Sequence, residues 1–166
     1  MAGFTAPPDN AEPAAGQMIE ADGWFPGINT NAVRARIRIG DGAVTEARLA
    51  EAVIAAMLAG IKALAAWRSA HAEAGLAGLA DVSDATLAGE NMAEVIWRRI
   101  LIYYAAAELM DTHTDVSATD DILDREDEKR LTADSYRRKA YEAVSDLRGL
   151  GPAGEPDLGR NVVELI

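Results

Sequence analysis

The chain has 166 residues, of which 49% are hydrophobic and only 5% aromatic, and it carries a formal net charge of −11 at pH 7 with no cysteine. The acidic balance argues against a protein that wraps nucleic acid, because phosphate binding needs a basic surface. The lack of cysteine excludes disulfides and thiolate metal sites. No run of eighteen apolar residues and no signal-peptide pattern is present, so we expect a cytoplasmic protein.

Residues 1–22 are rich in Pro, Ala and Gly without a hydrophobic period, and we interpret them as a flexible N-terminal arm. Two large aromatics, Trp24 and Phe25, follow, and Pro26 favours an extended chain at Phe25. Two alternatives remain for this pair. The side chains either plug the chain's own bundle or anchor it to a neighbouring subunit.

A short helix is predicted from Asn29, which can cap it, to a stop at Gly40. Three basic residues recur at alternate positions in this helix: Arg34, Arg36 and Arg38. We interpret them as a solvated face or, on so acidic a protein, as a surface that docks on acidic residues next door.

Residues 45–74 have the pattern of one long helix. Thr45 can cap it, Val44 can staple onto Leu49, and Gly75 closes it. The apolar residues at its steps of three and four are Leu49, Val53, Met57, Ile61 and Leu64. An uninterrupted helix of this span would be a rod of about 45 Å, along which the other helices would pack.

The remaining chain predicts two further helices. A loop is expected over 75–89, and Asn91 with Glu94 forms a capping box for a helix that runs to Met110. A polar connection over 111–120 leads to a charged helix over 121–148, acidic at its start and basic at its end as the helix dipole favours. A Gly/Pro-rich linker then precedes a short β-prone tail from Asn161 to Ile166.

Three patterns resemble chemical sites without meeting their requirements. The string Gly149 to Gly154 matches G-x-G-x-x-G but follows a helix rather than a strand. The run that starts at Asp111 lacks the glycine and the bidentate glutamate of a calcium loop. Neither His71 nor His113 has the Glu-x-x-His context of a di-metal bundle. We therefore expect no enzyme activity, no metal and no cofactor.

Several segments, in order, resemble the head completion (GPL-type) proteins of contractile-tailed phages. Their shared order and spacing run from Gly23 to Arg148. The segments are Trp24-Phe25-Pro26-x-Ile28, Val33-Arg34-x-Arg36-x-Arg38, Val44-x-x-Ala47-Arg48-Leu49, Ala74-Gly75, Leu79-Ala80-Asp81-Val82 and Gly89-Glu90.

The resemblance implies a structural virion protein of the head–tail connector (adaptor) class. Such a protein forms a ring, twelvefold to match the portal, that retains the packaged DNA and offers the tail or neck completion protein a platform. DNA would pass through without sequence-specific binding. The expected location is the head–tail neck of the virion, after assembly in the host cytoplasm.

We thus predict an all-α, elongated bundle of about four helices with one long central helix. Its expected organisation is an arm (1–22), a helical connector domain (23–148), and a linker with an extended C-terminal tail (149–166). The expected subunit-interface residues are Trp24, Phe25, Arg34, Arg36 and Arg38, and the expected portal-binding residues are Val162, Val163, Leu165 and Ile166.

The thin core favours a chain that is monomeric in dilute solution and assembles on the portal. The alternatives are a small helical regulatory or DNA-binding protein, which the arginine cluster supports, and a carboxylate-rich metalloenzyme. The net charge and the lack of a helix-turn-helix pair stand against DNA binding.

Overall fold

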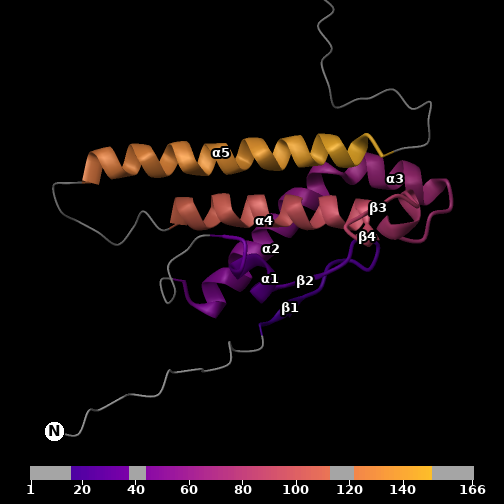
Figure 1. Ribbon diagram of the computed structural model, residues 1–166, viewed down its shortest axis with the longest axis horizontal. Helices are drawn as coiled ribbons and strands as arrows, with labels where there is room; N and C mark the ends of the chain where they lie inside the picture. The colour runs from indigo at the N-terminus through magenta and orange to yellow at the C-terminus, as the bar shows by residue number, and fades with distance from the viewer. Residues whose placement is uncertain (1–15, 38–43, 113–121, 151–166) are drawn as a thin grey trace, which may run out of the picture.

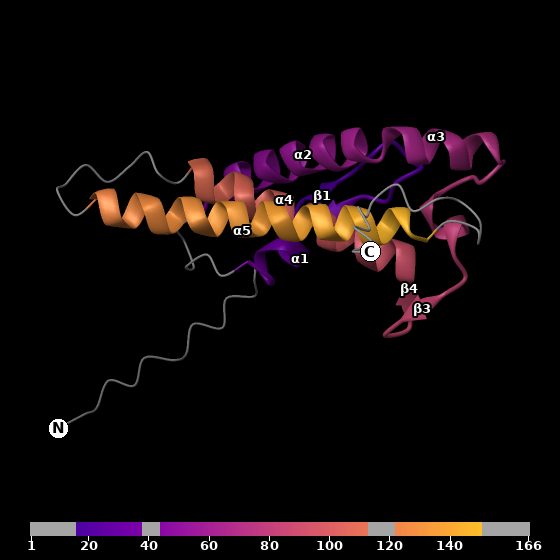
Figure 2. The same ribbon diagram turned by 90° about the horizontal axis from the view of Figure 1, so that it is seen from above.

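The computed structural model describes residues 16–37, 44–112 and 122–150, with side chains described except at 122–131. Three long helices dominate it: α2 (Glu46–Ala63), α4 (Met92–Thr112) and α5 (Ile122–Arg148). Helix α4 packs against both of the others, and α5 runs back along it (Figure 1). Seen from above, α2 lies on one side of the α4–α5 pair and the short α1 (Thr30–Arg34) on the other (Figure 2). The prediction of an all-α, elongated bundle is confirmed.

Three predicted helix starts are formed by the side chains that the sequence indicates. The Asn29 side chain accepts a hydrogen bond from the Asn31 N–H (2.8 Å), and the Thr45 side chain accepts one from the Arg48 N–H (3.4 Å). The Asn91 side chain accepts from the N–H groups of Ala93 and Glu94. Each cap satisfies N–H groups that have no partner inside the helix.

The predicted single helix over 45–74 is wrong, because it is divided at Leu64. Helix α2 ends at Ala63, α3 occupies Ala65–Glu73, and the two axes differ by 62°. No proline lies there, and two tertiary contacts coincide with the break. The Leu64 side chain is fully buried, and the Arg148 guanidinium donates a hydrogen bond to the Ala63 carbonyl. The break makes α4, rather than the 45–74 segment, the central helix, and it raises the number of described α-helices to five.

Two short antiparallel ladders complete the described ranges. Strand β1 (Met18–Ile19) pairs with β2 (Ile28–Asn29), so residues 16–22, which the sequence placed in the arm, belong to the ordered body. The predicted loop over 75–89 contains a 3₁₀ helix, η1 (Leu79–Val82), and strand β3 (Thr86–Leu87). Strand β3 pairs with β4 (Glu90–Asn91) immediately before α4.

The core lies between α4 and the elements around it. The predicted apolar stripe of α2 points inward, since Leu49, Val53 and Met57 are buried. Helix α4 is buried on several sides, through Trp97, Ile100, Leu101, Ala105 and Ala106. In the described part of the chain no single helix is long and apolar enough to cross a membrane, and α2 and α3 meet that criterion only together, across their bend.

Several predictions concern residues outside the described ranges. These are the stop at Gly40, the side chain of Arg38, His113 and most of the calcium-like run, the G-x-G-x-x-G string beyond Leu150, and the tail residues Val162, Val163, Leu165 and Ile166.

Candidate functional site

The segment from Asp22 to Pro26 is held in place by its own backbone and by one carboxylate. The Asp22 carboxylate accepts hydrogen bonds from the N–H groups of Trp24 (3.2 Å) and Phe25 (3.1 Å). Its other oxygen forms an ion pair with Arg68 of α3 at 2.7 Å. Gly23 supplies the positive φ of +83° that the turn between Asp22 and Trp24 requires.

The side chains of Trp24 and Phe25 lie inside the chain's own core, with exposed fractions of 7% and 1%. Phe25 stacks on Trp97 with ring centroids 4.4 Å apart. Trp24 meets Trp67 edge to face at 5.8 Å and donates a hydrogen bond from Nε1 to the Leu76 carbonyl. The structure therefore favours the first of the two alternatives for this pair, a plug in its own bundle. A neighbouring subunit could touch only the exposed remainder of Trp24.

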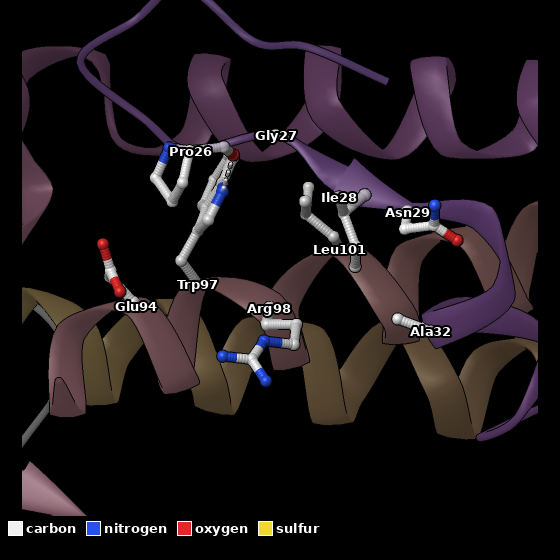
Figure 3. A pocket seen from close by; sticks show the side chains of 9 residues that line it. All are labelled: Pro26, Gly27, Ile28, Asn29, Ala32, Glu94, Trp97, Arg98 and Leu101. Atoms are coloured by element: carbon white, nitrogen blue, oxygen red, sulfur yellow. Dashed lines mark hydrogen bonds between the residues drawn. The ribbon is translucent and has the colours of Figure 1, made fainter. Parts of the chain in front are cut away.

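An open groove of about 320 Å³ lies between the extended segment 26–29 and α4 (Figure 3). Trp97 rises from α4 and donates a hydrogen bond from Nε1 to the Pro26 carbonyl at 2.9 Å, which ties the two walls together. Gly27 is required here because a Cβ would lie 2.5 Å from the Ile19 carbonyl oxygen. Ile28, Leu101 and Ala32 form the apolar part of the lining.

Charged side chains flank this groove. Arg98, which lines the groove, forms an ion pair and a hydrogen bond with Glu90 of β4. That hydrogen bond, followed by the positive charge of Arg98, lowers the pKa of Glu90. The positive charge of Arg36 acts on the pKa of Glu90 in the same direction, with a smaller effect.

The predicted arginine cluster divides into one engaged residue and one available residue. Arg34 pairs with the Glu46 carboxylate at 3.0 Å and donates to the Val44 carbonyl. Arg36, in the turn that follows α1, is exposed, and within the described ranges its guanidinium donates to the Ala32 carbonyl. Among the described residues Arg36 makes no ion pair.

The side chain of Glu46 joins α1 to the start of α2. Its carboxylate accepts a hydrogen bond from the Thr30 hydroxyl, and Thr30 is fully buried. The Thr30 bond is the largest cause that lowers the pKa of Glu46, and Arg34 adds to it. Arg34 therefore stabilises the junction of α1 and α2 within its own chain.

Two buried nitrogen atoms of α3 have no hydrogen-bond partner among the described residues: Trp67 Nε1 and His71 Nε2. The rings of Trp67 and His71 meet edge to face at 4.4 Å. Within the described ranges no group of three His, Asp or Glu side chains is placed to hold a metal ion. The residues around the segment thus offer stacking, hydrogen bonding and ion pairing.

The sequence alone does not identify four residues of this cluster. Asp22 lies at the end of the presumed arm, and Trp67 with Arg68 lies in the alanine-rich part of the presumed single helix. Trp97 falls off the centre of its helix stripe, so its full burial is not predictable from spacing. Only the long-range contacts of segment 22–26 reveal these residues as one cluster.

Comparison with known proteins gives one match. A sequence model of the family described as phage head completion protein (GPL) matches residues 19–154, which span all of the described helices. No curated protein and no solved structure matches the chain.

Proposed function

The chain belongs to the phage head completion protein (GPL) family, a family of structural virion proteins, and from this membership we propose that it is a head–tail connector subunit. In this role it forms a ring beneath the portal vertex, retains the packaged DNA and provides the platform on which the tail is attached. The observation that carries the proposal is the family match over residues 19–154, which covers the whole helical body.

The shape and the charge of the molecule support this role. The three long helices give a narrow, elongated subunit, a form suited to packing side by side around a channel. A net charge of −11 would repel DNA, so the wall of such a channel would let the genome slide rather than bind it.

The exposed cation of Arg36 supports a contact with an acidic neighbour. It lies two residues after the end of α1 and bonds back to the Ala32 carbonyl of that helix. We propose that Arg36, together with Arg38, docks on acidic residues of an adjacent subunit or of the portal. Arg34 is already paired with Glu46 within its own chain, so we assign the docking contact to Arg36 and Arg38.

The apolar residues Val162, Val163, Leu165 and Ile166 are the proposed portal-binding element. An extended apolar segment behind a Gly/Pro-rich linker can add a strand to the exposed edge of a partner's sheet. Deletion of residues 161–166 should abolish attachment to portal rings and leave the circular dichroism of the bundle unchanged. Undiminished attachment would refute this assignment.

The connector role is tested by negative-stain imaging of the purified chain, alone and mixed with portal rings from the same genome. We expect an additional ring stacked on the portal in the mixture and single subunits in its absence. Portal rings from an unrelated phage serve as the control. Bare portals beside free subunits would refute the proposal.

A further inference from the structure

A second groove, of about 210 Å³, lies where α2 faces the α4–α5 pair. Its α2 wall consists of small residues, Ala55, Ala56 and Ala59. Tyr104 and Tyr141 form its other wall, with their rings 6.1 Å apart. Small residues on one wall and aromatic residues on the other leave room for side chains from outside.

Large apolar side chains are exposed on the helices α2 and α5, which both line this groove. Tyr141 of α5 lines it and is 61% exposed, and on α2 Leu58 is 67% and Ile54 is 41% exposed. These are three of the five large hydrophobic side chains that are exposed in the described part of the chain. Exposed apolar side chains on two helices that face each other are typical of a contact surface.

The same side carries unpaired negative charge. Glu108 lines the groove together with Arg137, and Arg137 is paired with Asp111 and Asp134. Glu51 of α2 lines a neighbouring pocket that also includes Glu108, and within the described ranges neither glutamate forms an ion pair. We call the surface formed by Glu51, Ile54, Leu58, Glu108 and Tyr141 the α2 flank.

The opposite side of the α4–α5 seam has the complementary character. Tyr103 and Tyr136 face each other there with ring centroids 6.4 Å apart. The Lys139 ammonium lies 5.6 Å from the Tyr136 ring centre, and the Arg99 guanidinium lies 5.7 Å from that of Tyr103. Neither cation forms an ion pair among the described residues. We call these four residues the tyrosine flank.

We propose that the tyrosine flank of one copy of this chain docks on the α2 flank of the next copy. Each surface therefore binds another copy of the same chain. Unpaired cations over aromatic rings would meet unpaired carboxylates beside exposed apolar side chains, so the two surfaces complement each other in charge and in chemistry. Tyrosine and arginine are also the residue types that protein interfaces favour.

The positions of the two surfaces suit a closed ring. Contacts between two different surfaces of identical subunits generate rings or filaments, whereas a contact of one surface with itself stops at a dimer. Tyr103 and Tyr104 are consecutive in α4, yet one belongs to the tyrosine flank and the other to the groove. Both surfaces therefore lie at the same level along the bundle, and side-by-side copies need no axial stagger, which favours a flat ring.

This inference rests on the proposed connector function, because it assigns the contact by which the subunits of that ring hold one another. The chain contains no cysteine, so an introduced pair of cysteines is the only site for a thiol cross-linker. Leu58→Cys labels the α2 flank and Lys139→Cys labels the tyrosine flank, and both positions are exposed.

The test treats the double variant with a short bis-maleimide in the presence of portal rings. We expect a ladder of cross-linked multimers. Each single variant should remain uncross-linked, and an equal mixture of the two single variants should stop at dimers, because each chain then offers one reactive flank. Glu73→Cys, on exposed α3, replaces Leu58→Cys in the control pair and should give no ladder.

Charge reversal supplies a second, independent measurement. Arg99→Glu with Lys139→Glu should reduce the number of copies per portal at least tenfold, and adding Glu51→Arg and Glu108→Arg to the same chain should restore it. Subunits that assemble on portals without the ladder, or despite the charge reversal, would overturn this inference while the connector function stands. Portals that never acquire subunits, even with the unaltered chain, would overturn both.

Discussion

Substituting Gly60 by alanine tests how closely α2 and α4 approach each other. Gly60 is buried in α2, and an added Cβ would lie 2.8 Å from Cζ3 and 3.1 Å from Cη2 of Trp97. Trp97 is 1% exposed, and its ring is fixed by the stack with Phe25 and by the hydrogen bond to Pro26. The ring can therefore move away from Gly60 only by disturbing these two contacts.

Two opposing effects decide whether Gly60→Ala stabilises or destabilises the fold. Alanine is favoured over glycine in a helix by about 1 kcal/mol, whereas overpacking a close-packed core costs typically about 1–3 kcal/mol. Because the clashing atoms belong to a fixed ring, we expect the overpacking cost to exceed the gain, with a net loss of about 1 kcal/mol. For a chain of this length such a loss lowers the Tm by roughly 2–4 °C.

The measurement is thermal and urea unfolding followed by circular dichroism at 222 nm. The matched comparison repeats Gly60→Ala in a Trp97→Phe background, where the outer ring atoms that clash are missing. There the same substitution should be neutral or stabilising. A higher Tm for Gly60→Ala in the unaltered chain, or an equal loss in both backgrounds, would refute the close-approach reasoning.

Three further changes have defined outcomes. Phe25→Ala removes a buried ring from the aromatic stack and should lower the free energy of unfolding by about 3–5 kcal/mol in urea titrations. Glu46→Gln should lower the Tm at pH 7. Because Thr30 lowers the pKa of the folded carboxyl below its usual 4.5, this difference should be present above about pH 4.5 and disappear as the pH falls through the lowered pKa. Arg148→Gln deprives the Ala63 carbonyl of its charged donor and should cost about 1–3 kcal/mol in the same titrations.

Each of these has a matched control on the surface. Met18→Ala changes an exposed apolar side chain, Glu51→Gln an unpaired carboxylate, and Arg138→Gln an exposed cation, and all three should shift the free energy of unfolding by less than about 0.5 kcal/mol. If a control changes the free energy of unfolding as much as its test variant does, the contact assigned to that variant is contradicted.

The helix starts were predictable because their causes are local. Asn29, Thr45 and Asn91 each bond to N–H groups two or three residues ahead, so the pattern in the sequence contains the whole interaction. The burial of Leu49 and Val53 follows in the same way from their spacing on one face of α2.

The break at Leu64 and the aromatic cluster were not predictable, because their causes are distant in the chain. The residues around Leu64 all favour helix, and the bend is associated with contacts that come from elsewhere. Arg148 reaches the Ala63 carbonyl from the end of α5, and Asp22 holds Arg68 from the N-terminal side. Arg148 and Asp22 lie far from residues 63–68 in the sequence, so the hydrophobic period of the helix gives no sign of these contacts.

All three tryptophans of the chain lie around segment 22–26. Trp24 contacts Trp67, and Phe25 stacks on Trp97, so the indole fluorescence of the protein arises from one small region. The described part of α5 contains only tyrosines as aromatic residues. Tryptophan emission therefore reports whether segment 22–26 is seated on α3 and α4, while far-ultraviolet dichroism reports the helices as a whole. Comparing the two signals during unfolding reveals whether the bundle opens as one unit or releases this segment first.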